Sequence, residues 1–553
     1  MADDIKSAQI ICSGGLNSNE NNLALSESSP GGASRLINYE PSMFGGYRRV
    51  EGYRELDNNL GEVGQTGVSA TGKVLGVFIY RNEHIGNPYF IAARKDYGSN
   101  TYSFYKYVFF AGWQVMATGL PANALEVTKS GRTVEKIRAA QWNFGDGSHI
   151  AFVDGVNNCT VFDGVNWKQI STTGAGTDAD PGGPQALDAP SVVEVFEKSI
   201  FLSGDTAFGP IAAYSAAADW YDFTAANGGQ LVAGFSIVNI KPFRNNLFLF
   251  GNNDIKKVVP DSTFAFLVEN VTNNVGCIAK DSVVEIGGDL MFLSPDGLRP
   301  VAGTSKIGDV ELQTLSKPIQ GKLVDIIKNY DMDTVNSLVI RSKSQVRLFY
   351  GDDDDEPSES MGVIGALSAN NSQIGWEFGE LQGIRCSCCT SGYVGRIEYI
   401  LHGDYDGKVY QQEYGTSFNG SDIISIYSTP YIDFGDTEER KVMRKINTFV
   451  RAEGPFELLL SVQFDWGDVN VARPSTYTQE SEGQPVIYNG RNINYVVGNG
   501  TSNIIFGGAS KPIMTTDVQG SGFSARASYV SIGQTQPHSI QGLVFEYSVA
   551  GRR

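Results

Sequence analysis

Short apolar strands followed by turn residues recur along the middle of the chain. Between Ile150 and His402, six segments read as an apolar strand and then a turn of Gly, Asp, Asn or Ser. Their starts are 50, 47, 43, 56 and 53 residues apart. The segments are IAFVDG (150–155), IFLSGD (200–205), LFLFGNND (247–254), LMFLSPDG (290–297), VRLFYGDD (346–353) and YILHGDYDG (399–407). This spacing is typical of the blades of a β-propeller, which are four-stranded sheets of roughly 40–50 residues.

A further blade is expected at residues 74–107, which contain the strand patterns VLGVFIY, PYFIAAR and YSFYKYVFF. Together with the six repeats, this stretch predicts a propeller of about seven blades over residues 61–420. Residues 171–190 are a low-complexity loop between two blades. Propellers serve enzymes, lectins and assembly platforms alike, so the fold alone does not decide the function.

The hydrophobic period changes after residue 420. Every second residue from Phe456 to Trp466 is apolar, which is the pattern of one face of a half-buried strand. Residues 445–451 lead into it through the turn Glu453-Gly454-Pro455, and the last strand again carries apolar side chains on one face. A β-sandwich or barrel over residues 421–553 is the natural interpretation.

Residues 1–60 are polar and rich in Asn, Ser and Gly, with turn signals at Pro30-Gly31-Gly32 and Gly45-Gly46. They predict an extended arm that needs a surface to lie on. Helix is expected only in small pieces. The best candidate is 315–329, where Ser316 can cap the first turn, Pro318 lies in that turn, and apolar residues from Ile319 onward share one face.

Composition agrees with an all-β chain, because 64 of 553 residues are Gly and 11% are aromatic. The formal net charge is −18, the opposite of the clustered basic surface that binds a nucleic-acid backbone. The charge therefore argues against a reader of DNA, whereas a conduit for DNA is compatible with it. The plainer interpretation is that the charge only confers solubility.

The N-terminus MADDIKSAQII lacks the basic and apolar regions of a secretory signal, and no stretch is apolar enough to span a membrane. Six cysteines are too few for a disulfide scaffold. We therefore expect assembly in a reducing cytoplasm.

The candidate chemistry is sparse. Residues 352–356 (DDDDE) could form a calcium loop, but they lack alternating ligand spacing, so a solvated loop is favoured. Asp404-Tyr405-Asp406-Gly407 reads as a hairpin turn. Ser294-Pro295-Asp296-Gly297 is similar to one weak copy of a sialidase Asp-box turn.

The cluster Cys386, Cys388 and Cys389 has the spacing C-x-C-C, which is not that of a zinc site, and buried free thiols are favoured. On a strand, Cys386 and Cys388 would share one face and Cys389 would lie on the other. The four histidines are scattered. The sequence therefore nominates no catalytic, cofactor-binding or metal site, and no cofactor.

The N-terminal stretch GGLNSNENNLALSESSPGGASRLINYEPSMFGGYRRVEGY resembles the opening of tail nozzle, or packaged-DNA stabilisation (tail tubular), proteins of short-tailed, podovirus-like bacteriophages. The matching positions are Gly14, Gly15, Leu16, Pro30, Gly31, Ala33, Leu36, Asn38, Gly46, Arg48, Arg49, Gly52 and Tyr53. Near the other end, STPYIDFGDTEERKVMRKI (428–446) and HSIQGLVFEYSVAGRR (538–553) resemble later segments of the same family. The DDDDE loop and the loop at 171–190 have no counterpart in it.

The resemblance implies a structural virion protein without enzyme activity, assembled in the host bacterial cytoplasm and located in the phage tail. It implies a homo-hexameric ring that lies below the portal and the tail adaptor (the head-to-tail connector). Such a ring extends the DNA channel, retains packaged DNA, and conducts it during ejection without sequence-specific binding. Its other partners can include tail fibres or a needle.

Arg and Tyr are enriched where interfaces hold most of their binding energy. The hypothesised interface anchors are Arg48, Arg49, Tyr53, Arg440, Lys441, Arg552 and Arg553. Arg48 and Arg49 could instead merely flank a strand, and Arg552 and Arg553 could be a solvated tail. Two other functions stay open: a carbohydrate-binding or glycan-cleaving propeller on a virion or cell surface, and a scaffold propeller that binds a partner peptide without forming a ring.

Overall fold

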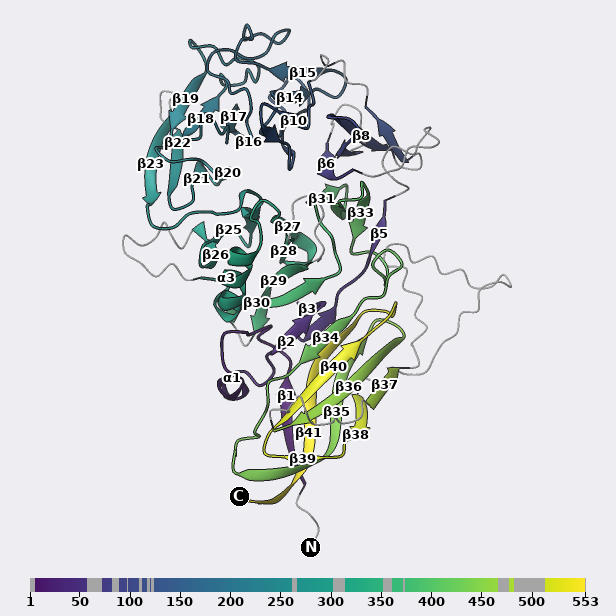
Figure 1. Ribbon diagram of the computed structural model, residues 1–553. Coiled ribbons are helices and arrows are strands. Elements are labelled where there is room, and N and C mark those ends of the chain that lie inside the picture. The colour runs from purple at the N-terminus through teal and green to yellow at the C-terminus, as the bar shows by residue number, and fades with distance from the viewer. Residues whose placement is uncertain are drawn as a thin grey trace, which may run out of the picture.

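A computed structural model shows an all-β chain in which a propeller lies above a β-sandwich (Figure 1). The fold class predicted from the sequence is confirmed. The structure describes residues 5–56, 72–81, 89–96, 98–108, 112–116, 120, 124–260, 266–301, 314–351, 361–370, 373–465, 477–481 and 513–552.

The first four sheets of the propeller are four-stranded and follow one another along the chain. Their strands are β6 (Val74–Tyr80), β7 (Tyr89–Lys95), β8 (Tyr102–Val108) and β9 (Gly112–Val115); β12 (Arg138–Trp142), β13 (His149–Val153), β14 (Cys159–Phe162) and β15 (Trp167–Ile170); β16 (Val192–Phe196), β17 (Ser199–Ser203), β18 (Ile211–Tyr214) and β19 (Gly229–Val232); and β20 (Asn239–Phe243), β21 (Asn246–Phe250), β22 (Ile255–Pro260) and β23 (Phe266–Thr272). A small hairpin of β10 (Thr128–Lys129) and β11 (Arg132–Thr133) lies between the first two.

Three more sheets complete the ring. They contain β24 (Val284–Ile286), β25 (Asp289–Ser294) and β26 (Gly297–Pro300); β27 (Asn336–Ile340), β28 (Gln345–Tyr350), β29 (Met361–Asn370) and β30 (Gln373–Gln382); and β31 (Cys388–Val394), β32 (Ile397–Gly403), β33 (Val409–Gln412) and β5 (Tyr53–Glu55). In the described chain, six blades are therefore four-stranded and β24–β26 is a three-stranded sheet, close to the expected count of about seven.

The six repeats of the sequence are the second strands of their sheets: β13, β17, β21, β25, β28 and β32. These strands are buried along nearly their whole length because neighbouring blades cover both of their faces. A strand covered on both faces reads as a continuous apolar run rather than an alternating one. Adjacent blades share separate apolar clusters, such as Phe104 and Phe152 between the first two and Phe250 and Phe292 farther round.

The last blade is closed by a strand from the beginning of the chain. β5 pairs antiparallel with β33, Tyr53 opposite Gln412, although it precedes the first blade in sequence. The apolar cluster between this last blade and the first contains Val74, Phe90 and Leu401. The N-terminal segment therefore closes the ring.

The sandwich consists of two sheets that face one another across one apolar core, which holds side chains of β36, β40 and β41. Its strands after the propeller are β34 (Ser425–Ser428), β35 (Glu439–Ala452), β36 (Phe456–Phe464), β37 (Tyr477–Ser481), β38 (Ile513–Asp517), β39 (Ser521–Gly522), β40 (Ala525–Ser531) and β41 (His538–Arg552). On β36 the even-numbered side chains from Phe456 to Val462 are buried, as the alternation predicts. Trp466 lies outside the described residues.

The N-terminal segment also contributes four strands farther down: β1 (Ile5–Ile11), β2 (Arg35–Ile37), β3 (Tyr39–Pro41) and β4 (Tyr47–Arg49). β2 pairs with β30 of the propeller on one edge and with β34 of the sandwich on the other. One nine-stranded sheet consequently runs from β27 through β2 to β37. Figure 1 shows β2 and β3 between the two bodies, and both ends of the chain at the foot of the sandwich.

Helix is rare in the described chain, as expected. The segment expected to be helical is the 3-10 turn η2 (Lys317–Ile319) followed by α3 (Gln320–Asn329), with Leu323 and Ile326 buried. Ser316 precedes it, but its hydroxyl accepts the amide of Leu298 instead of capping the helix. The other helical pieces are α1 (Asn22–Ser28), η1 (Lys280–Ser282) and η3 (Arg341–Lys343). The sequence reasoning missed α1, whose first turn is capped by the Asn21 side chain, which accepts the amide of Ala24.

Gly52 tests the ring closure. A Cβ built at Gly52 would lie 2.1 Å from the Ser417 carbonyl oxygen. Ser417 belongs to the loop that hydrogen bonds to the chain just before β5. We expect Gly52→Ala to lower the free energy of unfolding by about 1–3 kcal/mol, because the added methyl group pushes the closing strand away. Urea unfolding measures the change.

The matched control is Gly375→Ala, at an exposed strand position where a Cβ meets nothing within 4 Å. It should stay within about 0.5 kcal/mol of the unmodified chain. Equal unfolding midpoints for the two variants would contradict the importance of this contact.

Candidate functional site

A group of buried charges lies where the propeller, the N-terminal strands and the sandwich meet. Glu40, on β3, is its centre and is 2% exposed. Its carboxylate accepts hydrogen bonds from Lys343 Nζ (2.6 Å), Arg48 Nη1 (3.1 Å), Gln345 Nε2 (3.1 Å) and Arg347 Nη2 (3.3 Å). A buried carboxylate is tolerated only when it is paired and hydrogen bonded in this way.

Glu413, which follows β33 in the last blade, faces the same cations. Lys343 and Arg347 both form ion pairs with its carboxylate. Arg347 also donates from Nη1 to Gln412 Oε1 at 2.9 Å, and its own side chain is 1% exposed. The two blades that begin with β27 and β31 are therefore held together by charge at this corner.

Arg48 extends the group into the sandwich. Its guanidinium donates to both carboxylate oxygens of Glu453, each at 2.7 Å, and to Glu51 at 2.7 Å. We call Glu40, Arg48, Glu51, Lys343, Arg347, Glu413 and Glu453 the junction cluster. Since Glu453 lies between β35 and β36, the cluster joins all three parts of the chain.

The cations decide the protonation state of Glu413 and Glu40. Burial opposes ionisation of Glu413, but Lys343 and Arg347 outweigh it and hold its pKa well below the ordinary value. Glu40 behaves alike: burial disfavours its charge, and Lys343, Arg48 and Arg347 nevertheless lower its pKa. The neighbouring His402 is neutral, because burial, aided by Arg347, lowers its pKa to about 3.

Most of the hypothesised interface anchors are engaged inside the chain. Arg48 belongs to the junction cluster. Arg49 is fully buried and donates to the carbonyl of Ile423 (2.8 Å) and to the side chains of Ser425 and Thr535, so its guanidinium is not presented at the surface of this chain. The ring of Tyr53 stacks on Phe418 and lies edge-on to Tyr410.

The C-terminal anchors lie along one sandwich sheet, away from the junction cluster. Arg440 is exposed and donates to the Ser521 hydroxyl at 3.1 Å. Lys441 is 1% exposed and donates to the carbonyls of Asp436 and Phe523. The backbone of Arg552 pairs with Glu439, and Arg553 lies outside the described residues.

A second charged group bridges the middle of the propeller. Arg138, at the start of β12, donates from Nε and Nη2 to the two carboxylate oxygens of Asp281 on η1, both at 2.7 Å. Lys136 lies 3.4 Å from the same carboxylate and donates to the carbonyl of Val335 (2.8 Å), just before β27. These elements belong to blades that are not neighbours in the ring, so their contacts cross its centre and obstruct the channel of the single propeller at this level.

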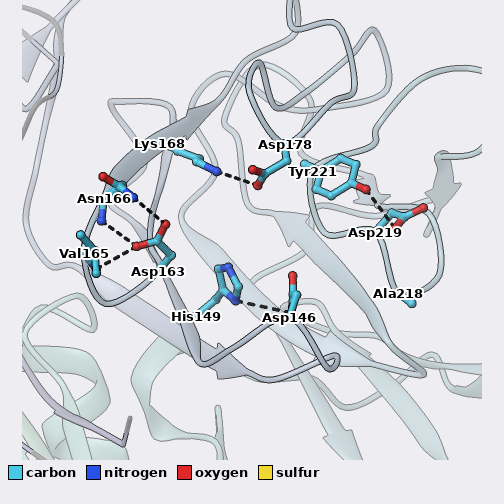
Figure 2. A pocket seen from close by; sticks show the side chains of 10 residues that line it. All are labelled: Asp146, His149, Asp163, Val165, Asn166, Lys168, Asp178, Ala218, Asp219 and Tyr221. Atoms are coloured by element: carbon cyan, nitrogen blue, oxygen red, sulfur yellow. Dashed lines mark hydrogen bonds and ion pairs between the residues drawn. The ribbon is translucent and has the colours of Figure 1, made fainter. Parts of the chain in front are cut away.

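A polar cavity of about 570 Å³ lies between the two blades that begin with β12 and β16 (Figure 2). It is lined by Asp146, His149, Asp163, Val165, Asn166, Lys168, Asp178, Ala218, Asp219 and Tyr221. Each carboxylate has a partner: Lys168 Nζ lies 2.6 Å from Asp178, the Tyr221 hydroxyl donates to Asp219 at 3.2 Å, and His149 lies 3.7 Å from Asp146.

Asp163 in this cavity is held in its ionised form. Partial burial would favour the neutral acid, but the backbone amides of Asn166 and Val165 donate to its carboxylate and lower its pKa. A general acid for glycoside cleavage needs the opposite, a raised pKa. Asp163 is therefore suited to binding and not to proton donation.

The remaining sequence candidates behave as ordinary structural elements. The Asp404 carboxylate accepts the amides of Asp406 and Lys408, which makes a hairpin turn. Asp296 accepts the Ser294 hydroxyl within the turn between β25 and β26. Residues 352–356 lie outside the described residues. Across the part of the chain that the structure describes, no three His, Cys, Asp or Glu side chains are grouped to hold a metal, and no helix is long and apolar enough to cross a membrane.

The expected arrangement of the three clustered cysteines is wrong in one respect. All three are free thiols, and Cys386 and Cys388 are buried. Cys388, however, packs between the last and first blades, whereas Cys386 and Cys389 contact the cluster on the other side of their sheet. The reason is that β31 begins only at Cys388, so Cys386 lies in the bend before the strand and does not follow its alternation.

Comparison with known proteins adds little. The chain matches no protein-family model and no curated protein. Among solved structures, a quinonprotein alcohol dehydrogenase-like protein from Bacteroides thetaiotaomicron is 11% identical, with a TM-score of 0.31 over 55% of this chain and 66% of that one, just under two thirds of its length. Hsv2 from Kluyveromyces lactis is 10% identical, with a TM-score of 0.28 over 56% of this chain and 98% of that one. Neither likeness bears on function.

The sequence reasoning missed Glu40, Lys343, Arg347 and Glu413. One signal was available: Arg347 stands inside the apolar strand VRLFY, where a charged side chain has to be buried and paired. Its partners could not be found from the sequence, because Glu40 is 307 residues away.

Removing one member of the junction cluster should be strongly destabilising. Arg347→Met leaves Glu40 and Glu413 short of a buried cation, and we expect the free energy of unfolding to fall by about 3–5 kcal/mol. The control is Arg341→Met. Arg341 lies six residues earlier and is exposed, so this substitution should change the free energy of unfolding by less than about 0.5 kcal/mol. Chemical denaturation of both variants measures the two changes. An Arg347→Met variant as stable as the unmodified chain would contradict the role assigned to the cluster.

The cluster also predicts how stability depends on pH. The pKa of Glu413 is lowered in the folded chain, so its stabilising contribution is complete above the ordinary Glu value of 4.5 and is lost as the pH falls below it. The free energy of unfolding, measured by urea titration at a series of pH values, should therefore decline on acidification. In Glu413→Gln the decline should be shallower, so that the difference between the two proteins narrows toward low pH. Parallel curves would show that Glu413 does not carry the effect.

Proposed function

We propose that this chain is a structural protein of a short phage tail. It serves as a ring subunit, or nozzle, which extends the DNA channel below the portal and adaptor, retains packaged DNA and conducts it during ejection. The observation that most supports this proposal is where the three resembling segments lie. β41, from the last segment, pairs with β4 from the first and with β35 from the middle one, and β2 of the first segment pairs with β34 at Ser428, where the middle segment begins. The resemblance thus belongs to one connected part of the fold.

The closed propeller centre constrains how such a subunit would work. Arg138 and Asp281 bridge the middle of the ring of blades, so DNA would not pass through a single propeller. The passage would instead lie on the axis of a ring of six copies. A closed ring of identical subunits uses two different patches on each copy. A formal net charge of −18 would discourage DNA from adhering to the wall of that passage.

The proposed partners are further copies of this chain and the tail adaptor, with tail fibres or a needle as additional contacts. The proposed location is the virion tail, after assembly in the host cytoplasm. No enzymatic step is included. Arg440, a member of the hypothesised interface set, is exposed on the sandwich.

A second candidate is carbohydrate binding, and the cavity of Figure 2 favours it. Its lining combines carboxylates, an amide, a lysine and the partly exposed ring of Tyr221, groups that can hydrogen bond to hydroxyls and pack against a sugar face. The partnered carboxylates make binding a better match than cleavage. This function could also exist on a virion surface.

Electron microscopy of intact virions with gold-labelled antibody against this chain tests the proposal. Label at the tail, together with six-fold averages of the detached tail, is the expected result. Virions without label would overturn the tail assignment, and hydrolase turnover by the purified chain would overturn its non-enzymatic part. If the virions carry no label, binding of the chain to a glycan array would favour the second candidate. This binding should be lost in Lys168→Ala, because Lys168 lines the cavity. It should be kept in Lys129→Ala, because Lys129 is an exposed lysine outside the cavity.

A further inference from the structure

A second cavity lies beside the charges that cross the centre of the propeller. Its volume is about 170 Å³, and four cationic side chains help to line it: Arg132, Lys136, Arg138 and Lys280. Its other walls come from the turns after β13 and β17 and from the segments before β16 and β27. We call it the central cavity. It can hold a small ion as well as water, since one water molecule needs roughly 10–15 Å³.

Three of these four cations have a carboxylate partner inside the chain. Arg138 and Lys136 share Asp281, as described above. Arg132, on β11, donates from Nη1 to Asp205 at 3.2 Å. The charges of these three side chains are therefore at least partly compensated without a ligand.

Lys280 lacks such a partner. Within the described residues, no carboxylate oxygen lies within 4 Å of its Nζ, and its one hydrogen bond, to the Ser191 hydroxyl, is long at 3.4 Å. An ammonium group has three donors, so Lys280 has donors to spare where it lines the cavity. Burial and the nearby Arg138 and Lys136 lower the pKa of Lys280, as expected for a cation that has too little opposite charge around it.

The fold, and not a loose loop, places Lys280 at the cavity. Its carbonyl accepts a hydrogen bond from Asn239 Nδ2 on β20. The carbonyl of the next residue, Asp281, accepts the Ser337 hydroxyl on β27. The short segment η1 is thus tied to two other blades, and the Lys280 side chain starts from a fixed backbone.

The carboxylates that line the central cavity are engaged elsewhere or open to solvent. Glu135 lies 3.2 Å from Lys73 Nζ, and Asp154 accepts the Tyr102 hydroxyl at 2.8 Å. Asp333 is exposed. None of the three forms an ion pair with Lys280 in the described chain, so they leave its charge available to a ligand.

We propose that the central cavity binds a tetrahedral oxyanion, either free phosphate or the phosphate group of a small ester, with Lys280 as its main counter-charge. Lys280 offers a compact point charge, and Arg132 offers the guanidinium donors that Asp205 does not use. These donors start from separate segments, η1 and β11. A tetrahedral ion presents acceptor oxygens in all directions and suits such a set better than a flat carboxylate does.

The site joins segments of several blades, so a bound anion would favour the folded chain. It is a property of the propeller alone and does not depend on the proposed tail function. Binding can be measured on the purified full-length chain, and its failure would leave the tail assignment untouched.

The test is isothermal titration calorimetry of the full-length chain with sodium phosphate at constant ionic strength. We expect one phosphate per chain. Lys280→Met should weaken binding at least about tenfold, because a hydrogen bond to a charged group is lost. The matched control is Lys445→Met, an exposed lysine of the sandwich, which should bind phosphate as the unmodified chain does.

Other ligands define the class of anion. Acetate should bind more weakly than phosphate, and acetate that binds more tightly would overturn the proposed class. Methyl phosphate separates the two sources, since binding equal to that of phosphate supports an ester group and its exclusion supports the free ion. Absence of saturable phosphate binding, or equal dissociation constants for the unmodified chain and Lys280→Met, would overturn the site.

A second measurement needs no variant. Acetic anhydride labels accessible lysine amines, and mass spectrometry of the digested chain reports each of them. Phosphate should protect Lys280 in the unmodified chain and leave Lys445 labelled as before. Equal labelling of Lys280 with and without phosphate would contradict the proposal, whatever the stability of the Lys280→Met variant.

Discussion

The hydrogen bonds on the two edges of β2 connect the two large bodies of this protein. One edge pairs in parallel with β30 and the other antiparallel with β34, so a propeller blade and a sandwich sheet become a single sheet. The same N-terminal segment then provides β3 and β4 to the second sandwich sheet and β5 to the last blade. The propeller, the sandwich and the ring closure all depend on residues that precede the first blade.

This arrangement buries Glu40 and Arg347, and the junction cluster around them is the consequence. Glu40 is brought under the propeller by β3 and would be severely destabilising there without Lys343, Arg347 and Arg48 around it. Each partner of Glu40 comes from a different element. All charges of the cluster are therefore paired only when the N-terminal segment, the blades and the turn near Glu453 are in place. Such a group specifies one relative arrangement of the parts, even where its net contribution to stability is small.

The other charged group, across the propeller centre, changes how a channel function has to be considered. A propeller suggests a tube, but Arg138 and Asp281 bridge the middle of this one. Under the proposed function, the propeller acts as a rigid wall element and the passage is a property of the assembly. The connected position of the three resembling segments, around β41 and β2, fits a subunit whose shared features lie in the sandwich and the arm.

The sequence by itself determined the classes of element and their order. A strand covered on both faces is largely apolar, so the second strands of six sheets were visible as a repeat. β36 was visible because only one of its faces is buried. These are local consequences of burial. The pairing of β2, the closure by β5 and the partners of Arg347 were decided by the tertiary structure alone. They join residues far apart in the sequence, as Arg347 and Glu40 are 307 positions apart, so no local pattern records them.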